Sequence, residues 1–321
     1  MARFDYVGFS LLALGVGALQ VMLDKGQEDD WFGSHFIATL AVLAVVGLVA
    51  LVVWEWRQKQ PIVDVHLFRN FNFATTNLMF LVLGAALFSS TVLMPQLLQT
   101  LMGYTAEDAG MVLSAGAIVM LFLLPMVGQF TTKVQARHLV AFGWLALAAG
   151  MYISARQTDL LISFGNAAWL RILQSVPIPF LFVPLTLAGY VGLSSDKTNS
   201  AAGMMNFMRN IGQSIGTSAV TTVLARRDQF HQSVLATYTA SPRFHTAVQG
   251  LALRLSHAGM SMPAARHQAL DRLYHLVLAQ TAALSYVDAY WLLAVAGAAM
   301  FAASFFLKPN RPGSGGQIAM H

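Results

Sequence analysis

The amino-acid sequence predicts an all-α integral membrane protein with about eight transmembrane helices. Hydrophobic residues make up 56% of its 321 residues and charged residues only 10%, whereas soluble chains carry about a quarter charged residues. Several apolar stretches approach or exceed the roughly 20 residues that a helix needs to cross a hydrocarbon core. Lipid leaves every backbone polar group to be satisfied inside the segment, and the alternating segments of a membrane β-barrel are absent, so we expect helices.

Eight apolar segments are expected to be the transmembrane helices. The fifth is the shortest, and the seventh is the most polar. In chain order the expected spans are Tyr6–Leu23, Phe36–Trp54, Ala74–Leu93, Ala109–Phe130, Leu139–Ser154, Ala167–Gly189, Phe207–Leu224 and Leu284–Leu307.

Two of these spans carry further local signals. The first does not read as a cleavable signal peptide, because Asp5 follows Arg3 closely and the acidic run at residues 24–30 replaces a small-residue cleavage site. The sixth contains Pro177 and Pro184, with a third proline at position 179. Each proline removes a helical hydrogen bond, so we expect a kink. The kink either marks a binding or bending point or is purely structural.

The one extended polar region lies between the seventh and eighth spans, at residues 225–283. It carries Pro242, Pro263 and scattered histidines, with apolar residues at helical spacing. We expect one or two amphipathic helices lying over the outer face or on the membrane surface. Beyond the last span, residues 309–321 are rich in Gly and Pro, and we expect a disordered cytoplasmic tail.

The distribution of Lys and Arg predicts that both chain ends lie in the cytoplasm. Positively charged residues concentrate in short cytoplasmic connections, and the short outer loops hold only Lys25 and Arg156. With the N-terminus inside, the inner connections and ends hold nine: Arg3, Arg57, Lys59, Arg69, Lys133, Arg137, Lys197, Lys308 and Arg311. This topology also explains the net charge of +5, so we expect no nucleic-acid partner.

No enzyme or metal site is expected. The chain has no cysteine, which excludes disulfides and thiolate metal sites. The histidines of the outer segment never show the i, i+4 spacing of a helical metal site. A phosphate loop and a Gly-x-Ser-x-Gly elbow are also missing. We therefore expect no catalytic residues and no cofactor.

The polar face of the seventh span is the first candidate for a functional site. Asn206, Arg209 and Gln213 recur at three- and four-residue steps, which places them on one helical face. Such a face either lines a translocation path or packs against another helix, with Arg209 snorkelling to the cytoplasmic interface. Gly212 and Gly216 form a small-xxx-small pair that would let a neighbouring helix come close.

Other spans supply further candidates for a substrate cavity. Arg171 and Gln174 open the sixth span at its outer end, where they would shape the outer side of the cavity. Asn77 lies inside the third span, with Gln96 and Gln99 at its outer end beside a proline. Polar side chains inside a membrane are costly, so each is either packed against another helix or exposed to a wet cavity.

Several motifs in the same order resemble the fourteen-helix drug:proton antiporters of the major facilitator superfamily, in the EmrB/QacA group. Near the start, Asp5-Tyr6-Val7-Gly8 and Asp24-Lys25-Gly26-Gln27 resemble the family's seventh-helix region. Met94-Pro95-Gln96 and the Gly103-Tyr104-Thr105-Ala106 that follows resemble the junction of its ninth and tenth helices. Asn206-Phe207-Met208-Arg209-Asn210-Ile211-Gly212 resembles its thirteenth helix. Gly128, Lys133 and Arg137 resemble a worn copy of the superfamily's cytoplasmic Gly…Arg loop motif.

The resemblance implies a partial major facilitator fold that lacks the first six helices. Residues 1–60 would be two linking helices and residues 61–308 the C-terminal six-helix bundle. Ala115 and Val176-Pro177 depart from the family pattern, so local helix bends are expected to differ.

The implied function is proton-coupled efflux of amphipathic drugs and toxic organics across the bacterial inner membrane. The implied partners are drug-like small molecules, protons, the lipid bilayer, and a periplasmic adaptor protein with an outer-membrane channel. The alternative is a truncated membrane interaction protein that transports nothing.

Overall fold

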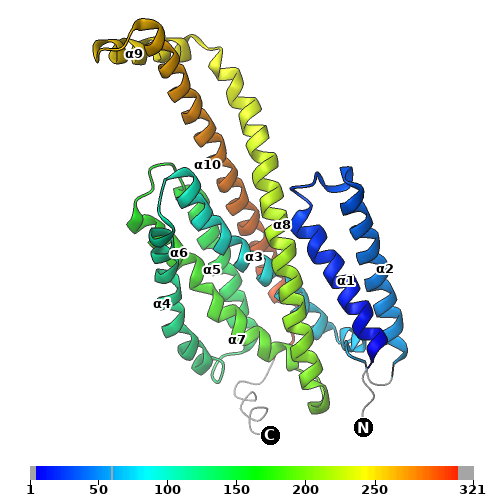
Figure 1. Cartoon of the computed structure of the whole chain (residues 1–321). Coiled ribbons are helices and arrows are strands. Elements are labelled where there is room, and N and C mark those ends of the chain that lie inside the picture. The colour runs from blue at the N-terminus through cyan, green and yellow to red at the C-terminus, as the bar shows by residue number, and fades with distance from the viewer. Residues whose placement is uncertain (1–4, 59–60, 310–321) are drawn as a thin grey trace.

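The computed structural model describes residues 5–58 and 61–309, and this part of the chain is all helical (Figure 1). The predicted fold class is therefore confirmed. In chain order the α-helices are α1 (Tyr6–Lys25), α2 (His35–Arg57), α3 (Phe71–Leu101), α4 (Ala106–Phe130), α5 (Ala136–Gln157), α6 (Phe164–Ser175), α7 (Pro177–Tyr190), α8 (Thr198–Thr239), α9 (Pro242–His257) and α10 (Met262–Ser304). Short 3₁₀ turns, η1 (Trp31–Gly33), η2 (Val65–Arg69) and η3 (Ser195–Lys197), lie in three of the connections.

Among the described residues, seven helical segments are long and apolar enough to span a membrane, with α6 and α7 counted as one. They include seven of the eight expected spans. The remaining one, the seventh expected span Phe207–Leu224, lies inside α8, which is long enough but carries too many polar side chains to qualify. It still packs extensively on α3 and α10 within the bundle. The amides and Arg209 on α8 explain the difference between seven and the expected eight.

Helices α1 and α2 form a hairpin beside α8 (Figure 1). They cross at two glycines: a Cβ at Gly47 would lie 2.9 Å from the Cα of Gly15. The hairpin contacts the rest of the bundle mainly through α1 and α8, where the Ser214 hydroxyl donates to the Gln20 side chain. The division of the chain at residue 60 stays a prediction.

The remaining membrane helices share one apolar core. Its largest fully buried side chains include Trp144 on α5, Tyr290 on α10 and Phe73 on α3. Helix α5 packs along α10, and a Cβ at Gly297 would lie 3.1 Å from the backbone nitrogen of Ala148. In lipid, helices associate through close van der Waals packing of this kind, which small residues permit.

The polar span α8 lies closest to α3. A Cβ added at Gly212 would clash with the carbonyl oxygen of Leu81, and one at Gly216 would clash with Ala85. On the α3 side, a Cβ at Gly84 would clash with the carbonyl oxygen of Arg209. The small-xxx-small spacing on α8 thus predicts the close helix approach correctly.

The sixth expected span is broken in two. Helix α6 ends at Ser175, and α7 begins at Pro177. Another proline, Pro184, lies inside α7 without ending that helix. The break is where the prolines predict a kink, because a proline has no N–H with which to continue the preceding helix.

The outer segment differs from the expected surface helices. Its first part continues α8 and its last part begins α10, so both helices extend beyond the bundle, and only α9 is a separate helix at their tip (Figure 1). We call this projection, residues 225–283, the stalk. A small apolar cluster of Val248, Ala252, Ala265 and Ala269 joins α9 to α10. No proline interrupts residues 225–241, which is why α8 runs on. Of the predicted tail, residues 309–321, all but the first residue lie outside the described part of the chain.

Candidate functional site

Arg171 and Gln174 meet inside the bundle. Arg171 on α6 is 8% exposed. Its guanidinium donates to the Thr91 hydroxyl of α3 at 3.1 Å and to the side-chain amide oxygen of Gln174 at 3.5 Å. The Gln174 amide in turn donates to the Ser154 hydroxyl of α5 at 2.9 Å. The sequence therefore identifies two members of a buried polar cluster that three helices share.

This cluster contains a cation without a matched anion. The Arg171 Nε atom is buried and has no hydrogen-bond partner among the described residues. Tyr290 of α10 is also fully buried, and its hydroxyl lies 4.0 Å from the sulfur of Met94. An ionised side chain within a membrane bundle is costly unless it is paired or reaches water.

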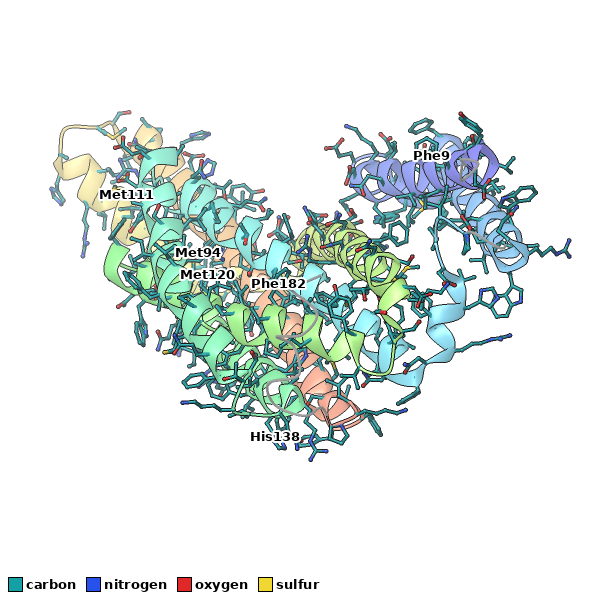
Figure 2. The ribbon with its side chains drawn as sticks, turned by 90° about the horizontal axis from the view of Figure 1, so that it is seen from below. Phe9, Met94, Met111, Met120, His138 and Phe182 are labelled. Atoms are coloured by element: carbon teal, nitrogen blue, oxygen red, sulfur yellow. The ribbon has the colours of Figure 1, made fainter. Side chains whose placement is uncertain are left out.

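The α8 face is more open. Asn206 is exposed, and Arg209 and Gln213 are half-buried. The Arg209 guanidinium lies over the ring of Phe182 on α7, 5.4 Å from its centroid, and the view from below places Phe182 inside the bundle near α8 (Figure 2). Phe80 of α3 packs edge-on against the same ring. Arg209 is thus engaged in a cation–π contact between helices.

The three candidate residues on α3 lie in different surroundings. Asn77 is fully buried, its amide donates to the Phe73 carbonyl at 2.9 Å, and its own carbonyl oxygen has no partner in the described part of the chain. Gln96 and Gln99 are exposed at the far end of α3. The eight predicted residues therefore fall into separate groups, and their shared role as a translocation path stays a prediction.

The predicted loop motif lies at the turn between α4 and α5. The Gly128 carbonyl accepts a hydrogen bond from the Thr131 hydroxyl at 2.7 Å, which tightens the end of α4. Lys133 is exposed, and Arg137 on α5 donates to the neighbouring His138 ring at 3.3 Å. These contacts are local, so the functional meaning of the motif stays a prediction.

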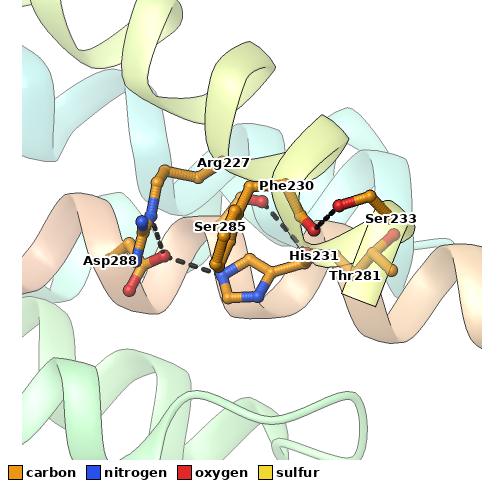
Figure 3. A network of polar contacts seen from close by, with 7 residues as sticks. All are labelled: Arg227, Phe230, His231, Ser233, Thr281, Ser285 and Asp288. Atoms are coloured by element: carbon orange, nitrogen blue, oxygen red, sulfur yellow. Dashed lines mark hydrogen bonds and ion pairs between the residues drawn. The ribbon is translucent and has the colours of Figure 1, made fainter. Parts of the chain in front are cut away.

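A polar cluster at the base of the stalk escaped the sequence analysis (Figure 3). One carboxylate oxygen of Asp288 on α10 accepts from Arg227 Nε at 2.6 Å and lies 2.7 Å from His231 Nε2. Arg227 also stacks over Phe230. The i, i+4 spacing of Arg227 and His231 was a usable signal, because it places both side chains on one face of α8.

The sequence did not single out one further feature, a buried carboxylate on α2. Glu55, near the end of α2, is fully buried, and neither of its side-chain oxygens has a hydrogen-bond partner within residues 5–58 or 61–309. A Cβ at Gly8 would lie 2.7 Å from an oxygen of Glu55 and equally close to one of Asp5. No periodic or motif signal distinguished Glu55, because it lies in an aromatic and aliphatic run.

Within the described residues, a second ion pair between distant segments lies outside the membrane helices. Lys197 in η3 lies 2.6 Å from Asp64, just ahead of η2, and the His66 ring lies 3.4 Å from the same carboxylate. Burial acts to raise the pKa of Asp64, but the hydrogen bond and charge of Lys197 outweigh it and hold that pKa below its ordinary value. The same carboxylate raises the pKa of Lys197.

Comparison with known proteins identifies the relatives of this bundle. No protein-family model matches the chain. It is 34% identical over 319 residues to the multidrug export protein EmrB of Escherichia coli K12, covering 99% of this chain and 61% of that protein. This chain is a homologue of the EmrB-type multidrug export proteins.

Two further relatives have a similar level of sequence identity to this chain. EmrB of Haemophilus influenzae is 34% identical over 310 residues, covering 95% of this chain and 59% of that protein. The fatty acid resistance protein FarB of Neisseria gonorrhoeae is 35% identical over 260 residues, covering 80% of this chain and 50% of that protein. The EmrB-type homology confirms the family resemblance of the sequence motifs. The chain spans less than two thirds of the length of these curated relatives.

Proposed function

We propose that this chain is the C-terminal part of a proton-coupled exporter of amphipathic drugs and toxic organics. The observation that carries the proposal is the buried Arg171–Gln174 cluster, a cation and an amide inside an apolar helical bundle whose relatives are named multidrug export proteins. Polar groups at this depth are retained where they face a substrate or an ion pathway.

The local structure suits a part that moves. Helix α6 ends at Ser175, so Arg171 and Gln174 lie within its last five residues, next to the break before α7. Broken helices with polar groups at the break are the usual site of binding and gating in secondary transporters. In this proposal Asn77, Asn206, Arg209 and Gln213 line the C-terminal wall, and Arg171 and Gln174 shape its outer side.

Alternating access needs two halves that rock around a central site. The six-helix bundle supplies one half, so the proposal requires a second half of similar architecture and a proton-carrying carboxylate. The bacterial inner membrane is the proposed location.

The stalk is the proposed docking surface for a periplasmic adaptor that leads to an outer-membrane channel. It projects beyond the bundle and exposes large apolar side chains, among them Tyr238 and Tyr274. Aromatic side chains of this kind are enriched at protein interfaces.

Substitution of Arg171 tests the proposal. Arg171→Ala in the complete exporter removes the donor to Thr91 and Gln174, and we expect a loss of about tenfold or more in substrate-driven proton movement in reconstituted vesicles. The matched control is Arg156→Ala, an exposed arginine at the end of α5, which should leave the rate unchanged. Equal rates for both variants would show that Arg171 has no role in transport. No substrate-driven proton movement in the unsubstituted exporter would favour the alternative of a non-transporting membrane interaction protein.

A further inference from the structure

A small pocket lies between α3, α8 and α10 at the end of the bundle from which the stalk rises. Its volume is about 280 Å³. It combines apolar, hydroxyl, amide and carboxylate groups, and its lining residues are Gln96, Thr221, Leu224, Ala225, Asp228, Ala282, Ser285 and Tyr286. Of the predicted site residues, only Gln96 reaches it.

The charge in this lining belongs to Asp228. One of its carboxylate oxygens accepts from the Gln232 amide at 2.8 Å. The other oxygen is buried and has no hydrogen-bond partner in the described structure. None of the lining residues is a lysine, arginine or histidine, and the adjacent Arg227 is bound to Asp288.

A buried carboxylate oxygen without a donor is unfavourable, because it has lost its hydration and gained nothing in return. A charged N–H donor that enters the pocket restores that interaction in its stronger, charge-assisted form. The other walls suit the same ligand. Tyr286, which is 5% exposed, adds an aromatic side chain to the lining, and Leu224 and Ala282 suit the attached hydrocarbon.

We propose that this pocket binds the ammonium head group of an amphipathic organic amine, with Asp228 as the counter-ion. Whole drug-sized ligands need about 300–1,000 Å³, so this pocket holds the head group while the rest of the ligand lies along the helices. The proposal deepens the proposed function and rests on it, since it names a substrate class for the outer end of the path.

The experiment measures binding to the full chain in lipid nanodiscs by calorimetry. The probes are phenylbutylammonium and its alcohol and carboxylate counterparts, which share one hydrocarbon and differ in charge. We expect the amine to bind at least about tenfold more tightly than the alcohol, and the carboxylate to bind most weakly. Asp228→Asn should bring the amine to the level of the alcohol, while the alcohol itself, bound as before, reports an intact fold.

The matched control is Asp271→Asn, an exposed carboxylate of the stalk, which should leave amine binding unchanged. Equal affinities for amine and alcohol, or full amine binding by Asp228→Asn, would overturn the proposal.

Nanodiscs with and without phosphatidylethanolamine separate the two sources of an ammonium group, a lipid head group and a free amine. Loss of probe binding with that lipid would assign the pocket to a lipid head group and overturn the substrate assignment. Export of uncharged substrates by the complete transporter is a separate measurement, so failure here leaves the proposed function standing.

Discussion

Single glycines decide how closely α3 and α8 approach. At Gly212, Gly216 and Gly84 an added methyl group would overlap the facing backbone, which cannot move aside as a side-chain end can. The same contact positions the α8 polar face, since the Arg209 carbonyl lies against Gly84 while its guanidinium reaches Phe182. Residue size at the helix crossing therefore controls where the polar groups lie.

Replacing Gly212 with alanine should destabilise the protein. The new methyl group would push α3 and α8 apart, and we expect the midpoint of thermal unfolding in detergent to fall by several degrees, about 1–3 kcal/mol as for other overpacked sites. Gly203→Ala is the matched control on the same helix, because nothing lies within 4 Å of its added Cβ. The control should be neutral or stabilising, since alanine favours a helix by about 1 kcal/mol over glycine. A Gly212→Ala protein as stable as the control would contradict this packing.

At the level of elements, the base of the stalk depends on Asp288. This carboxylate joins the two stalk helices by accepting from Arg227 and contacting His231, both on α8. Without it, Arg227 and His231 lose the partner on α10 that holds them to that helix.

Asp288→Asn should loosen the stalk. We expect faster amide hydrogen exchange in residues 225–239 by about tenfold, with exchange in α5 unchanged as the internal reference. Asp271→Asn, which alters an exposed stalk carboxylate, serves as the control. Equal protection in both variants would show that apolar packing alone holds α8 to α10.

Most elements of this fold could be predicted from the sequence, because long apolar runs in lipid leave few alternatives to helices. The proline-rich stretch predicted the α6–α7 break, and Gly212 and Gly216 predicted the tight crossing. The stalk could not be predicted in this way. Residues 225–241 are too polar for a span and lack a helix breaker, and only the pairing of α8 with α10 shows that they continue as helix. Glu55 and Asp228 were missed, since the burial of Glu55 and of one Asp228 oxygen depends on neighbours that a local sequence pattern does not show.

For the whole molecule, the segments ahead of α3 and α8 are joined by the Asp64–Lys197 pair. Asn72 adds to this linkage: its amide donates to the Ala188 carbonyl of α7, and its carbonyl accepts from the Lys308 backbone. Three parts of the chain that are far apart in sequence, residues 64–72, residues 188–197 and Lys308, therefore meet at one end of the bundle.

The stabilisation from the Asp64–Lys197 pair should depend on pH in a defined direction. Asp64 has a lowered pKa when folded, so its contribution is full above the ordinary value of 3.8 and is lost as the pH falls through the folded value. Lys197 has a raised pKa, so its contribution is lost as the pH rises above 10.5. Lys197→Met should lower stability at neutral pH by about 1 kcal/mol or less, because the lysine is 41% exposed. Unfolding midpoints of the two proteins should converge in strong acid, and a constant difference would contradict the assignment.

Because α8 is continuous from the bundle into the stalk, it can transmit movement from one to the other. Its last 15 residues extend about 22 Å beyond the expected span at 1.5 Å per residue. A tilt of about 10° at the bundle would therefore carry the tip sideways by about 4 Å, since a continuous helix transmits rotation along its length. The stalk therefore carries movement of the bundle to α9. A protein bound to α9 would be displaced when the bundle changes conformation, without contacting the bundle itself.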